Sequence, residues 1–572
     1  MVSVALVGNG RGLIFDDSSC EVNARAIRNL DVEIQHHGKN IVHLKRLRNS
    51  LLNVSLYLAP EILGHVFWWK VLSGVNPSGR ISGGTFNFLL VCRYWFDVAT
   101  STPSLWAFWG TSLRECVAFH RYSGAVPLYL NLADIDSDRE VRSASGVLQD
   151  RSVQGRIRHL HIHTSPKTLA KILSLMSTPK QPTVRSRIKS LTFMIEGPWN
   201  AERDEEFPDI TSFLNARSLP ELRFLRLRGC DLGWNSLILQ TSRLTHLFVH
   251  THEGFTKPSV LQLVALFARN NALEEIDLSI EIASTPDDPL LDISTSTFLP
   301  HLRRLTIHGS TTGHTRLLNR LTFSNALKQV NVDLSLDGVV IDVAAALAPF
   351  LQNIFLAYQS TKLAIHIVYA LVGLSINVSR PGERGDSEDF LMLRISSLHM
   401  GFWDVTPTLP EEVAKRLPTT KITSLSIRRY SPVFRQDFRR LFRMVGEVRE
   451  LRITDSAIDD IVQVLAAPPP TGEEGEPAPL PHLHTFRLKD INFASTSHNG
   501  TADLLARLLE QRHQEGLPLG KLSMVYCPHI NSGVCLRFAG FLDDHFCWDR
   551  YEVTGDRQRV CGTCHTRWSN LD

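Results

Sequence analysis

The sequence predicts an α/β protein in which an N-terminal helical module is followed by a degenerate repeat solenoid, with a curved parallel sheet and outer helices. Two patterns carry this prediction. Apolar residues at helical spacing, many of them aromatic, fill the stretch 58–109. From residue 157 onward, the spacing apolar-x-x-apolar-x-apolar recurs thirteen times. A chain of 572 residues is also too long for one compact core, so several domains or one long repeat array are expected.

The N-terminal segment, residues 1–52, predicts a leading helix. Its apolar residues follow a heptad in which two core positions are polar: the apolar members are Ile27, Leu30, Ile34, Ile41, Leu44 and Leu51, and the polar ones are His37 and Arg48. So short and interrupted a run is too little to predict a coiled-coil dimer. We therefore expect a single helix that packs back on the protein.

Two apolar blocks follow, and each predicts a helix. Pro60 suits a first helical turn because its φ is already fixed and its missing N–H costs nothing there. Glu61 comes next, where the positive end of the helix dipole favours a carboxylate. In the second block, apolar residues recur at helical spacing from Leu89 to Ala99, and Pro103 ends the helix because the residue before a proline avoids the α region.

Aromatic residues are dense in these blocks. Five of the ten tryptophans lie between positions 68 and 109. So small a module is not expected to hide them all, and an exposed aromatic patch usually marks a protein interface. The alternative is a buried helical hairpin that caps the next domain.

The stretch from Leu58 to Trp109 resembles an F-box. It has a helix that begins Leu-Ala-Pro-Glu-Ile-Leu, a loop, then Leu-Leu-Val-Cys-Arg-Tyr-Trp and Ser-Thr-Pro-Ser-Leu-Trp, as in the F-box family that is expanded in mushroom-forming fungi. It departs from that family at Ala59, where a second proline is common, and in a Gly-rich insert at 74–84. The resemblance implies binding to an Skp-type adaptor, and through it to a cullin. The residues that it implies contact the adaptor, or support that contact, are Leu58, Pro60, Glu61, Ile62, Leu63, Val66, Phe67, Leu90, Val91, Cys92, Trp95 and Trp106.

The region 156–530 carries the repeated spacing. The units begin at Ile157, Ile188, Leu222, Leu244, Leu273, Leu302, Leu327, Leu371, Ile395, Ile422, Val448, Leu483 and Leu519. The last two apolar positions of each unit alternate as in a strand with one buried face, and segments such as 260–271 and 501–514 have helical spacing.

This alternation resembles the leucine-rich-repeat family, most closely at Leu222–Leu232, with Cys230 at the ladder position. The long gap between Leu327 and Leu371 predicts a further unit near Leu363, and 381–389 and 468–481 are predicted loops. An irregular α/β domain is the alternative.

A curved sheet of such repeats would display, on its concave face, the residues that flank the packed apolar ones. They are Phe224, Arg226, Arg228, His246, Phe248, His250, Glu275, Asp277, Arg304, His308, Asn331, Asp333, Arg428, Arg452, Arg487, Lys489 and Lys521. Among them, the predicted client-binding residues are Arg226, Arg228, Phe248, Arg304, Arg428, Arg452, Arg487 and Lys489. Because the C-terminal part of this surface is basic, we expect it to recognise an acidic or phosphorylated client segment. The alternative is a solvated mixed surface.

No cofactor, metal or catalytic residue is predicted. His545, Cys547, Cys561 and Cys564 offer four possible zinc ligands, but His-x-Cys is poorly spaced, and reduced cysteines are the simpler interpretation. Three histidines, His159, His161 and His163, share one face of a presumed strand, where polar residues on an open sheet face explain them more simply than a metal.

Charge and hydropathy exclude two classes of partner. The net charge of +3 gives no reason to expect nucleic acid or an anionic membrane. No uncharged apolar stretch has the length of a membrane-spanning helix. We expect a cytoplasmic or nuclear location, or both.

The predicted organisation has five parts. They are an N-terminal segment at 1–52, an F-box at 53–110, a connecting segment at 111–155, a leucine-rich-repeat-like solenoid at 156–530 and a Cys-rich tail at 531–572. The predicted function is a non-enzymatic substrate receptor of an SCF-type cullin ubiquitin ligase, which binds the adaptor through the F-box and a client through the repeats. The alternative is a repeat scaffold with no role in ubiquitin transfer.

Overall fold

The structure of the protein is a computed structural model. It describes residues 17–52, 58–74, 84–109, 113–133, 135, 138–177, 187–195, 210–211, 214, 219–241, 243–251, 254–283, 296–335, 343–356, 363–370, 373–380, 388–396, 415, 422–428, 435–454, 458–466, 478–493, 500–530 and 532–548. The chain divides into two compact units, Met1–Asn131 and Leu132–Asp572. Among the described residues, no helix is long and apolar enough to cross a membrane.

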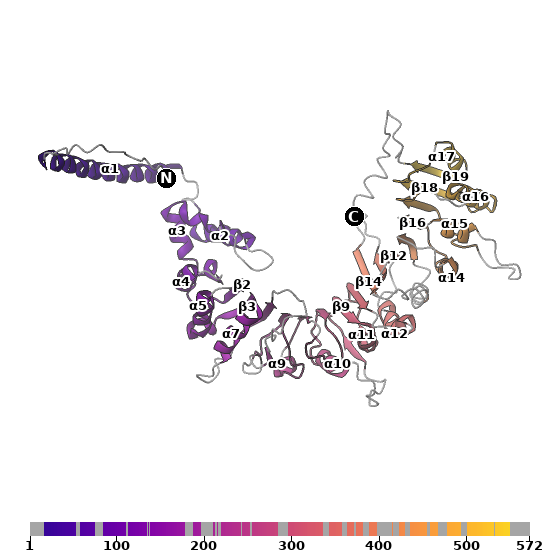
Figure 1. Cartoon of the computed structure of the whole chain (residues 1–572), viewed down its shortest axis with the longest axis horizontal. Coiled ribbons are helices and arrows are strands. Elements are labelled where there is room, and N and C mark those ends of the chain that lie inside the picture. The colour runs from indigo at the N-terminus through magenta and orange to yellow at the C-terminus, as the bar shows by residue number, and fades with distance from the viewer. Residues whose placement is uncertain are drawn as a thin grey trace, which may run out of the picture. The chain divides into compact units, whose positions relative to one another are not determined.

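The N-terminal unit is mainly helical (Figure 1). Its elements are α1 (Asp17–Leu52), α2 (Pro60–Gly74), the 3-10 turn η2 (Asn87–Leu90), α3 (Arg93–Thr100), the 3-10 turn η3 (Pro103–Trp106), β1 (Phe108–Trp109), α4 (Leu113–Tyr122) and β2 (Leu128–Ala133). Strands β1 and β2 pair in parallel. Helix α2 begins at Pro60, as predicted from the fixed φ of that residue.

The second predicted helix is shorter than the spacing indicated. Leu89 lies in η2, and α3 begins only at Arg93. Cys92 separates them because its backbone is extended, with φ −160° and ψ 169°. The helix still ends before Pro103, at Thr100.

Helix α1 corrects one expectation. It is 36 residues long, and all its described side chains between 21 and 48 are exposed, including Ile27, Ile34 and Leu44. The expected packing of this helix back on the protein is therefore wrong for the described residues. The heptad spacing correctly predicted a helix in this segment, but it does not show what covers the apolar stripe of that helix.

The second unit is built on a large sheet. Its strands are β3 (Ile157–Thr164), β4 (Ser190–Ile195), β5 (Phe224–Arg228), β6 (His246–His250), β7 (Glu275–Ser279), β9 (Arg304–Ser310), β11 (Gln329–Ser335), β12 (Leu363–Ala370), β13 (Gly373–Arg380), β14 (Glu388–Ser396), β15 (Ile422–Arg428), β16 (Glu450–Thr454), β17 (Thr485–Lys489), β18 (Leu519–Val525) and β19 (Leu542–Trp548). Two short strands, β8 (Thr297–Leu299) and β10 (Leu321–Phe323), form a separate parallel pair. From β3 to β11 every neighbouring pair of the large sheet is parallel, and so is every pair from β15 to β19.

Helices alternate with these strands. They are α5 (Asp138–Gln149), α6 (Arg151–Gln154), α7 (Pro166–Ser177), α9 (Leu237–Thr241), α10 (Val260–Arg269), α11 (Thr311–Leu318), α12 (Val343–Leu356), α14 (Arg435–Met444), α15 (Ile458–Ala466), α16 (Thr501–Gln514) and α17 (Ser532–Ala539). Helix α10 matches the predicted helical segment, and α16 has its predicted bounds. At α10 a capping box closes the first turn, because Ser259 and Gln262 each bond the backbone N–H of the other.

The sheet is mixed at one place, and this corrects the repeat assignment there. Strand β13, which contains the predicted unit Leu374/Ile376, is antiparallel to both β12 and β14. Strand β12 pairs in parallel with β15, and β14 with β11. Only two residues separate the end of β12 from the start of β13. A connection of this length is too short for the crossover that a parallel pair needs. The predicted loop at 381–389 overlaps β14, and most of the loop at 468–481 lies outside the described residues.

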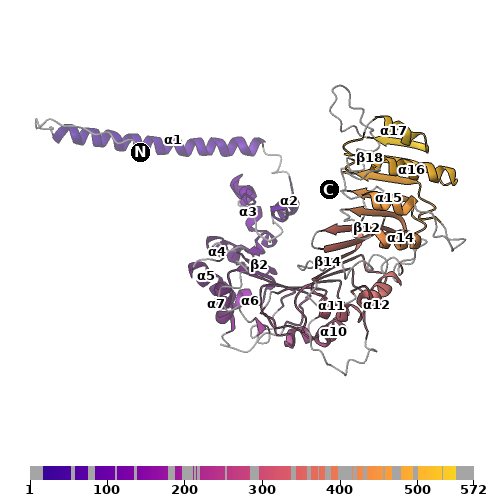
Figure 2. The ribbon, with the colours of Figure 1, turned by 45° about the vertical axis from the view of Figure 1, so that its right-hand side comes forward.

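The core of this unit lies between the sheet and the helices. Alternate strand residues such as Leu225, Leu227, Ile276 and Leu278 are buried, as the repeat spacing predicted. The labelled helices lie on one side of the sheet in both views (Figures 1 and 2). The strand residues between the buried ones therefore point to the other side, called the open face below. The open face carries the residues predicted for a concave surface.

Candidate functional site: an apolar patch and the open face of the sheet

The helices of the N-terminal unit pack around a small aromatic core. On α2 the buried side chains are Leu63, Phe67 and Val71. The ring of Phe67 stacks on Phe88 of η2 at a centroid distance of 4.3 Å and lies 5.1 Å from the ring of Trp95 on α3. The hydroxyl of Tyr94 donates to the carbonyl oxygen of Leu58 at 2.9 Å. These contacts tie the start of α2 to both η2 and α3.

Trp106 belongs to the same interior. Its side chain is 4% exposed, and its Nε1–H donates to the carbonyl oxygen of Ala99 at 2.8 Å. Its ring stacks on Phe86 at 5.6 Å and meets Phe119 edge-on at 5.4 Å. Three residues of the implied adaptor-binding set, Leu63, Phe67 and Trp106, therefore lie inside the module, where they can support its surface but do not form it.

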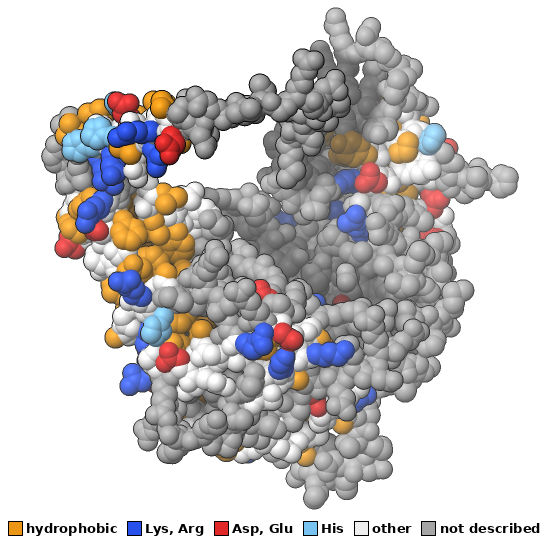
Figure 3. Space-filling view, turned by 60° about the vertical axis from the view of Figure 1, so that its left-hand side comes forward, with side chains coloured by type: hydrophobic (Ala, Val, Ile, Leu, Met, Phe, Trp, Pro, Cys, Tyr) orange, Lys and Arg blue, Asp and Glu red, His pale blue; other side chains and the backbone are white. Residues whose placement is uncertain are grey.

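Other apolar residues of the module are exposed. They are Leu58, Ile62, Val66 and Trp69 at and after the start of α2, and Leu90, Val91 and Phe96 near α3; together they are called the apolar patch. Leu90 is 84% exposed and Trp69 71%. Figure 3 shows hydrophobic side chains gathered on the surface of this unit. A large exposed apolar patch of this kind is typical of an interaction site.

The apolar patch and the implied adaptor-binding set differ in both directions. Pro60 and Glu61 are exposed beside it, and Cys92 and Trp95 are half-buried. Trp69 and Phe96 were missing from the predicted interface. The signal for Trp69 was in the sequence, because it follows Ile62 and Val66 at i+7 and i+3, on one stripe of α2.

On the open face, the N-terminal strands present an arginine between aromatic rings. The Arg226 guanidinium carbon lies 4.3 Å from the ring centroid of Phe248 on β6 and 5.5 Å from that of Phe224 on β5. The register places Arg226 directly opposite Phe248. Such an arrangement holds the planar cation in place while its outer edge stays free for hydrogen bonds. Arg228, two residues on, is exposed on the same face.

His161 lies two strands from Arg226 in the same register row. Burial, and then the nearby His163 and Arg226 charges, lower the pKa of His161 to about 4. Burial also lowers the pKa of His159. Both rings are therefore neutral at neutral pH and add no positive charge to this part of the face.

Further along the open face, arginine and histidine side chains lie beside carboxylates. Arg304 Nη1 lies 2.6 Å from Glu275 Oε1, and His250 Nε2 lies 3.0 Å from Asp277 Oδ1. His308 Nδ1 is 3.7 Å from Asp333 Oδ2. The predicted client-binding Arg304 is thus held by a carboxylate of the neighbouring strand.

The C-terminal part of the open face centres on Glu450, which sequence reasoning missed. Arg452 donates to both of its carboxylate oxygens at 3.0 Å, and Arg487 Nε lies 2.7 Å from Oε1. Arg487 is 7% exposed. The single carboxylate of Glu450 therefore lies beside both Arg452 and Arg487, two of the predicted client-binding residues. The signal was present, because Glu450 and Arg452 are two residues apart on one strand face. Arg428 is exposed and Lys489 half-buried in the same part of the sheet.

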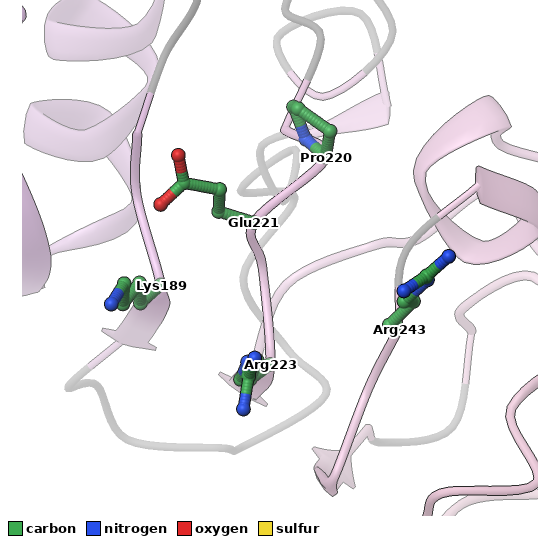
Figure 4. A pocket seen from close by; sticks show the side chains of 5 residues that line it. All are labelled: Lys189, Pro220, Glu221, Arg223 and Arg243. Atoms are coloured by element: carbon green, nitrogen blue, oxygen red, sulfur yellow. The ribbon is translucent and has the colours of Figure 1, made fainter.

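Cations without a carboxylate partner gather instead where β4, β5 and β6 begin (Figure 4). Lys189, Pro220, Glu221, Arg223 and Arg243 line a pocket of about 510 Å³. Backbone bonds from Lys189 N to Arg158 O (2.7 Å) and from Arg223 N to Lys189 O (2.9 Å) extend the strand ladder by one residue. Arg158, Lys189 and Arg223 thus lie at equivalent positions of successive strands. Within the described part of the chain, neither they nor Arg243 form an ion pair.

The other candidate ligands and nucleophiles do not form a site among the described residues. Cys547 is buried, Cys561 and Cys564 lie outside the described residues, and the His545 side chain is not described. Burial raises the pKa of the Cys527 thiol to about 12 and raises that of Cys230 as well, so both are thiols at neutral pH. No described group of three His, Cys, Asp or Glu residues has metal-binding geometry.

Comparison with known proteins adds no family. No family model matches the chain, and no curated protein matches it.

Proposed function

We propose that this chain is the substrate-receptor subunit of an SCF-type ubiquitin ligase. The observation that carries the proposal is the apolar patch, which lies on the module that resembles an F-box. A helical module that buries Leu63, Phe67 and Trp106 internally and still exposes Ile62, Leu90 and Trp69 has the composition of an interface core. An Skp-type adaptor is the partner that the resemblance implies.

The mechanism is proximity. The module holds the chain on the adaptor, and the repeat unit holds a client protein, so that a client lysine is near an activated thioester carried by another subunit. Tethering raises the effective concentration of the reacting groups without any catalytic residue in the receptor. Open-face residues that touch the client act only by binding.

The primary test is assembly. We expect the full chain, co-expressed with an Skp-type adaptor, to co-purify with it as a stoichiometric complex. A chain that folds but does not co-purify with the adaptor would overturn the receptor proposal. The repeat scaffold without a ubiquitin-ligase role would then be the better proposal.

The charges favour an acidic client segment that lies over the first repeats. Arg452 and Arg487 share Glu450, whereas Arg226, Arg228 and the pocket cations at the starts of β4–β6 have no carboxylate partner among the described residues. A carboxylate or phosphate gains most from cations that are not already neutralised. The proposed client surface therefore comprises Arg226 and Arg228 on the open face, together with Lys189, Arg223 and Arg243 at the edge where β4–β6 begin.

Neutralising the pocket is expected to weaken acidic-peptide binding. For Arg223→Gln/Arg243→Gln we expect about a tenfold higher Kd for a fluorescein-labelled Asp/Glu-rich decapeptide, measured by fluorescence anisotropy at low salt, because two exposed charge pairs are lost. A phosphoserine version of the peptide separates phosphate from carboxylate recognition. The matched control is Arg303→Gln/Lys328→Gln, which removes the same charge from two residues that, like Arg223, directly precede a strand. Of these two, Arg303 lies 3.8 Å from the carboxylate of Glu274. Equal weakening by both variants would contradict the pocket assignment.

A further inference from the structure

Helix α1 presents an apolar stripe that nothing in the described residues covers. Its heptad core positions carry Ile27, Leu30, Ile34, Ile41 and Leu44, which are between 53% and 67% exposed. At 1.5 Å per residue the helix is about 54 Å long. An exposed helix of this length is stabilised chiefly by a partner on its apolar face.

The types of residue along the stripe favour another helix as that partner. Isoleucine occupies the first core position of three successive heptads, at 27, 34 and 41, and leucine the second position at 30 and 44. In parallel coiled coils, isoleucine at the first core position with leucine at the second favours two strands over three or four, and polar residues in a coiled-coil core restrict the register. His37 and Arg48 are polar residues of this kind in the core of α1. A two-helix seam is therefore the arrangement that this pattern fits.

The charges along α1 identify the partner and its direction. Residues 17–35 carry four acidic and two basic residues, and residues 36–52 carry four basic residues and no acidic one. The helix thus has an acidic first half and a basic second half, and two antiparallel copies place the acidic half of each beside the basic half of the other. Of these charges, Asp17, Asp31, Glu33 and Lys45 occupy the heptad positions that flank the core, where charges of two paired helices meet. A parallel pair would place like charges together and would stack Arg48 on its own copy. We propose that α1 forms an antiparallel two-stranded coiled coil with α1 of a second copy of this chain.

The oligomeric state of the full chain tests the proposal. By sedimentation velocity at micromolar concentration, we expect a dimer for the natural sequence and a monomer for Ile34→Asp/Ile41→Asp. The matched control is Val32→Asp/Val42→Asp, because these valines are 66% and 47% exposed but lie off the stripe. The control variant is expected to remain a dimer. A monomeric natural chain, or equal dissociation of both variants, would overturn the pairing.

The natural Cys20 reports the direction of the helices. It occupies a heptad core position near the start of α1, seven residues before Ile27. A parallel pair would place the two Cys20 residues together, whereas an antiparallel pair places them near opposite ends of the coil. We expect mild oxidation of the dimer to give no Cys20-linked species, with Cys20→Ser as the control. A Cys20-dependent covalent dimer would overturn the antiparallel direction. Adaptor co-purification is a separate measurement, so the receptor proposal and the pairing can fail independently.

Discussion

Replacing Ile62 and Leu90 by aspartate is expected to weaken binding to the adaptor at least about 100-fold, which would abolish co-purification. The two side chains are 53% and 84% exposed, so neither contributes to the interior of the module. An aspartate in the centre of an apolar interface leaves a carboxylate desolvated and without a partner, and this cost is added to the lost apolar burial. The measurement is pull-down of the adaptor with each purified variant.

The control for this experiment uses similarly exposed leucines of the second unit. Leu237 is 55% exposed and Leu536 is 74% exposed, so Leu237→Asp/Leu536→Asp makes the same chemical change away from the apolar patch. We expect this control to bind the adaptor normally. Substitution at Leu63 is a poorer test, because that side chain is 1% exposed and its loss would unfold the module rather than remove a contact. Normal adaptor binding by Ile62→Asp/Leu90→Asp would contradict the proposed interface.

The parts of the fold that the sequence predicted are those set by local chemistry. Pro60 fixed the start of α2 because its ring imposes the first-turn φ wherever it lies in the chain. The alternation of Leu225 and Leu227 with Phe224, Arg226 and Arg228 predicted which side of β5 is buried, since successive side chains of a strand point to opposite faces. Neither inference needs knowledge of distant residues.

The parts of the fold that the sequence did not predict depend on which distant segments pair or pack together. The spacing at Leu374 and Ile376 is the same as in the other repeats, yet β13 is antiparallel, because direction depends on the short connection and not on the apolar pattern. Periodicity also cannot tell which aromatic of the module is inside. Trp106 is buried because its indole N–H reaches the Ala99 carbonyl and its ring fits between Phe86 and Phe119, and both conditions are tertiary.

The candidate site shows the same division. The list of open-face residues followed from strand alternation, and the structure places Arg226, Arg304 and Arg452 on that face. Whether an arginine is free to bind a client depends on its neighbours across the sheet. Glu275 holds Arg304 from the adjacent strand, and Glu450 holds Arg487 from another. These pairs depend on the register between neighbouring strands, which the sequence does not show. The sequence therefore did not reveal which cations, such as those at the starts of β4–β6, have no carboxylate partner among the described residues.

A buried asparagine between two neighbouring strand–helix segments is expected to have a large effect on stability. Asn270, at the end of α10, is 2% exposed. Its Oδ1 accepts from the backbone N–H of Leu244 at 3.0 Å, and its Nδ2 donates to the carbonyl oxygens of Leu266 at 2.9 Å and Leu239 at 3.4 Å. One side chain therefore joins the end of α10 to α9 and to the residues that lead into β6.

Asn270→Ala is expected to lower the local free energy of unfolding by about 3 kcal/mol, because it leaves buried backbone groups without partners. Proteins also unfold locally, in contiguous segments, so the effect is expected around the substitution. Hydrogen exchange followed by mass spectrometry measures this, with faster exchange expected in β6 and α10 and no change in α16. Asn235→Ala is the matched control, because the Asn235 side chain also accepts a hydrogen bond, from Gln262 Nε2 at 2.9 Å, but is exposed. Equal protection of β6 in both variants would show that the Asn270 bonds do not stabilise the contact between α10, α9 and β6.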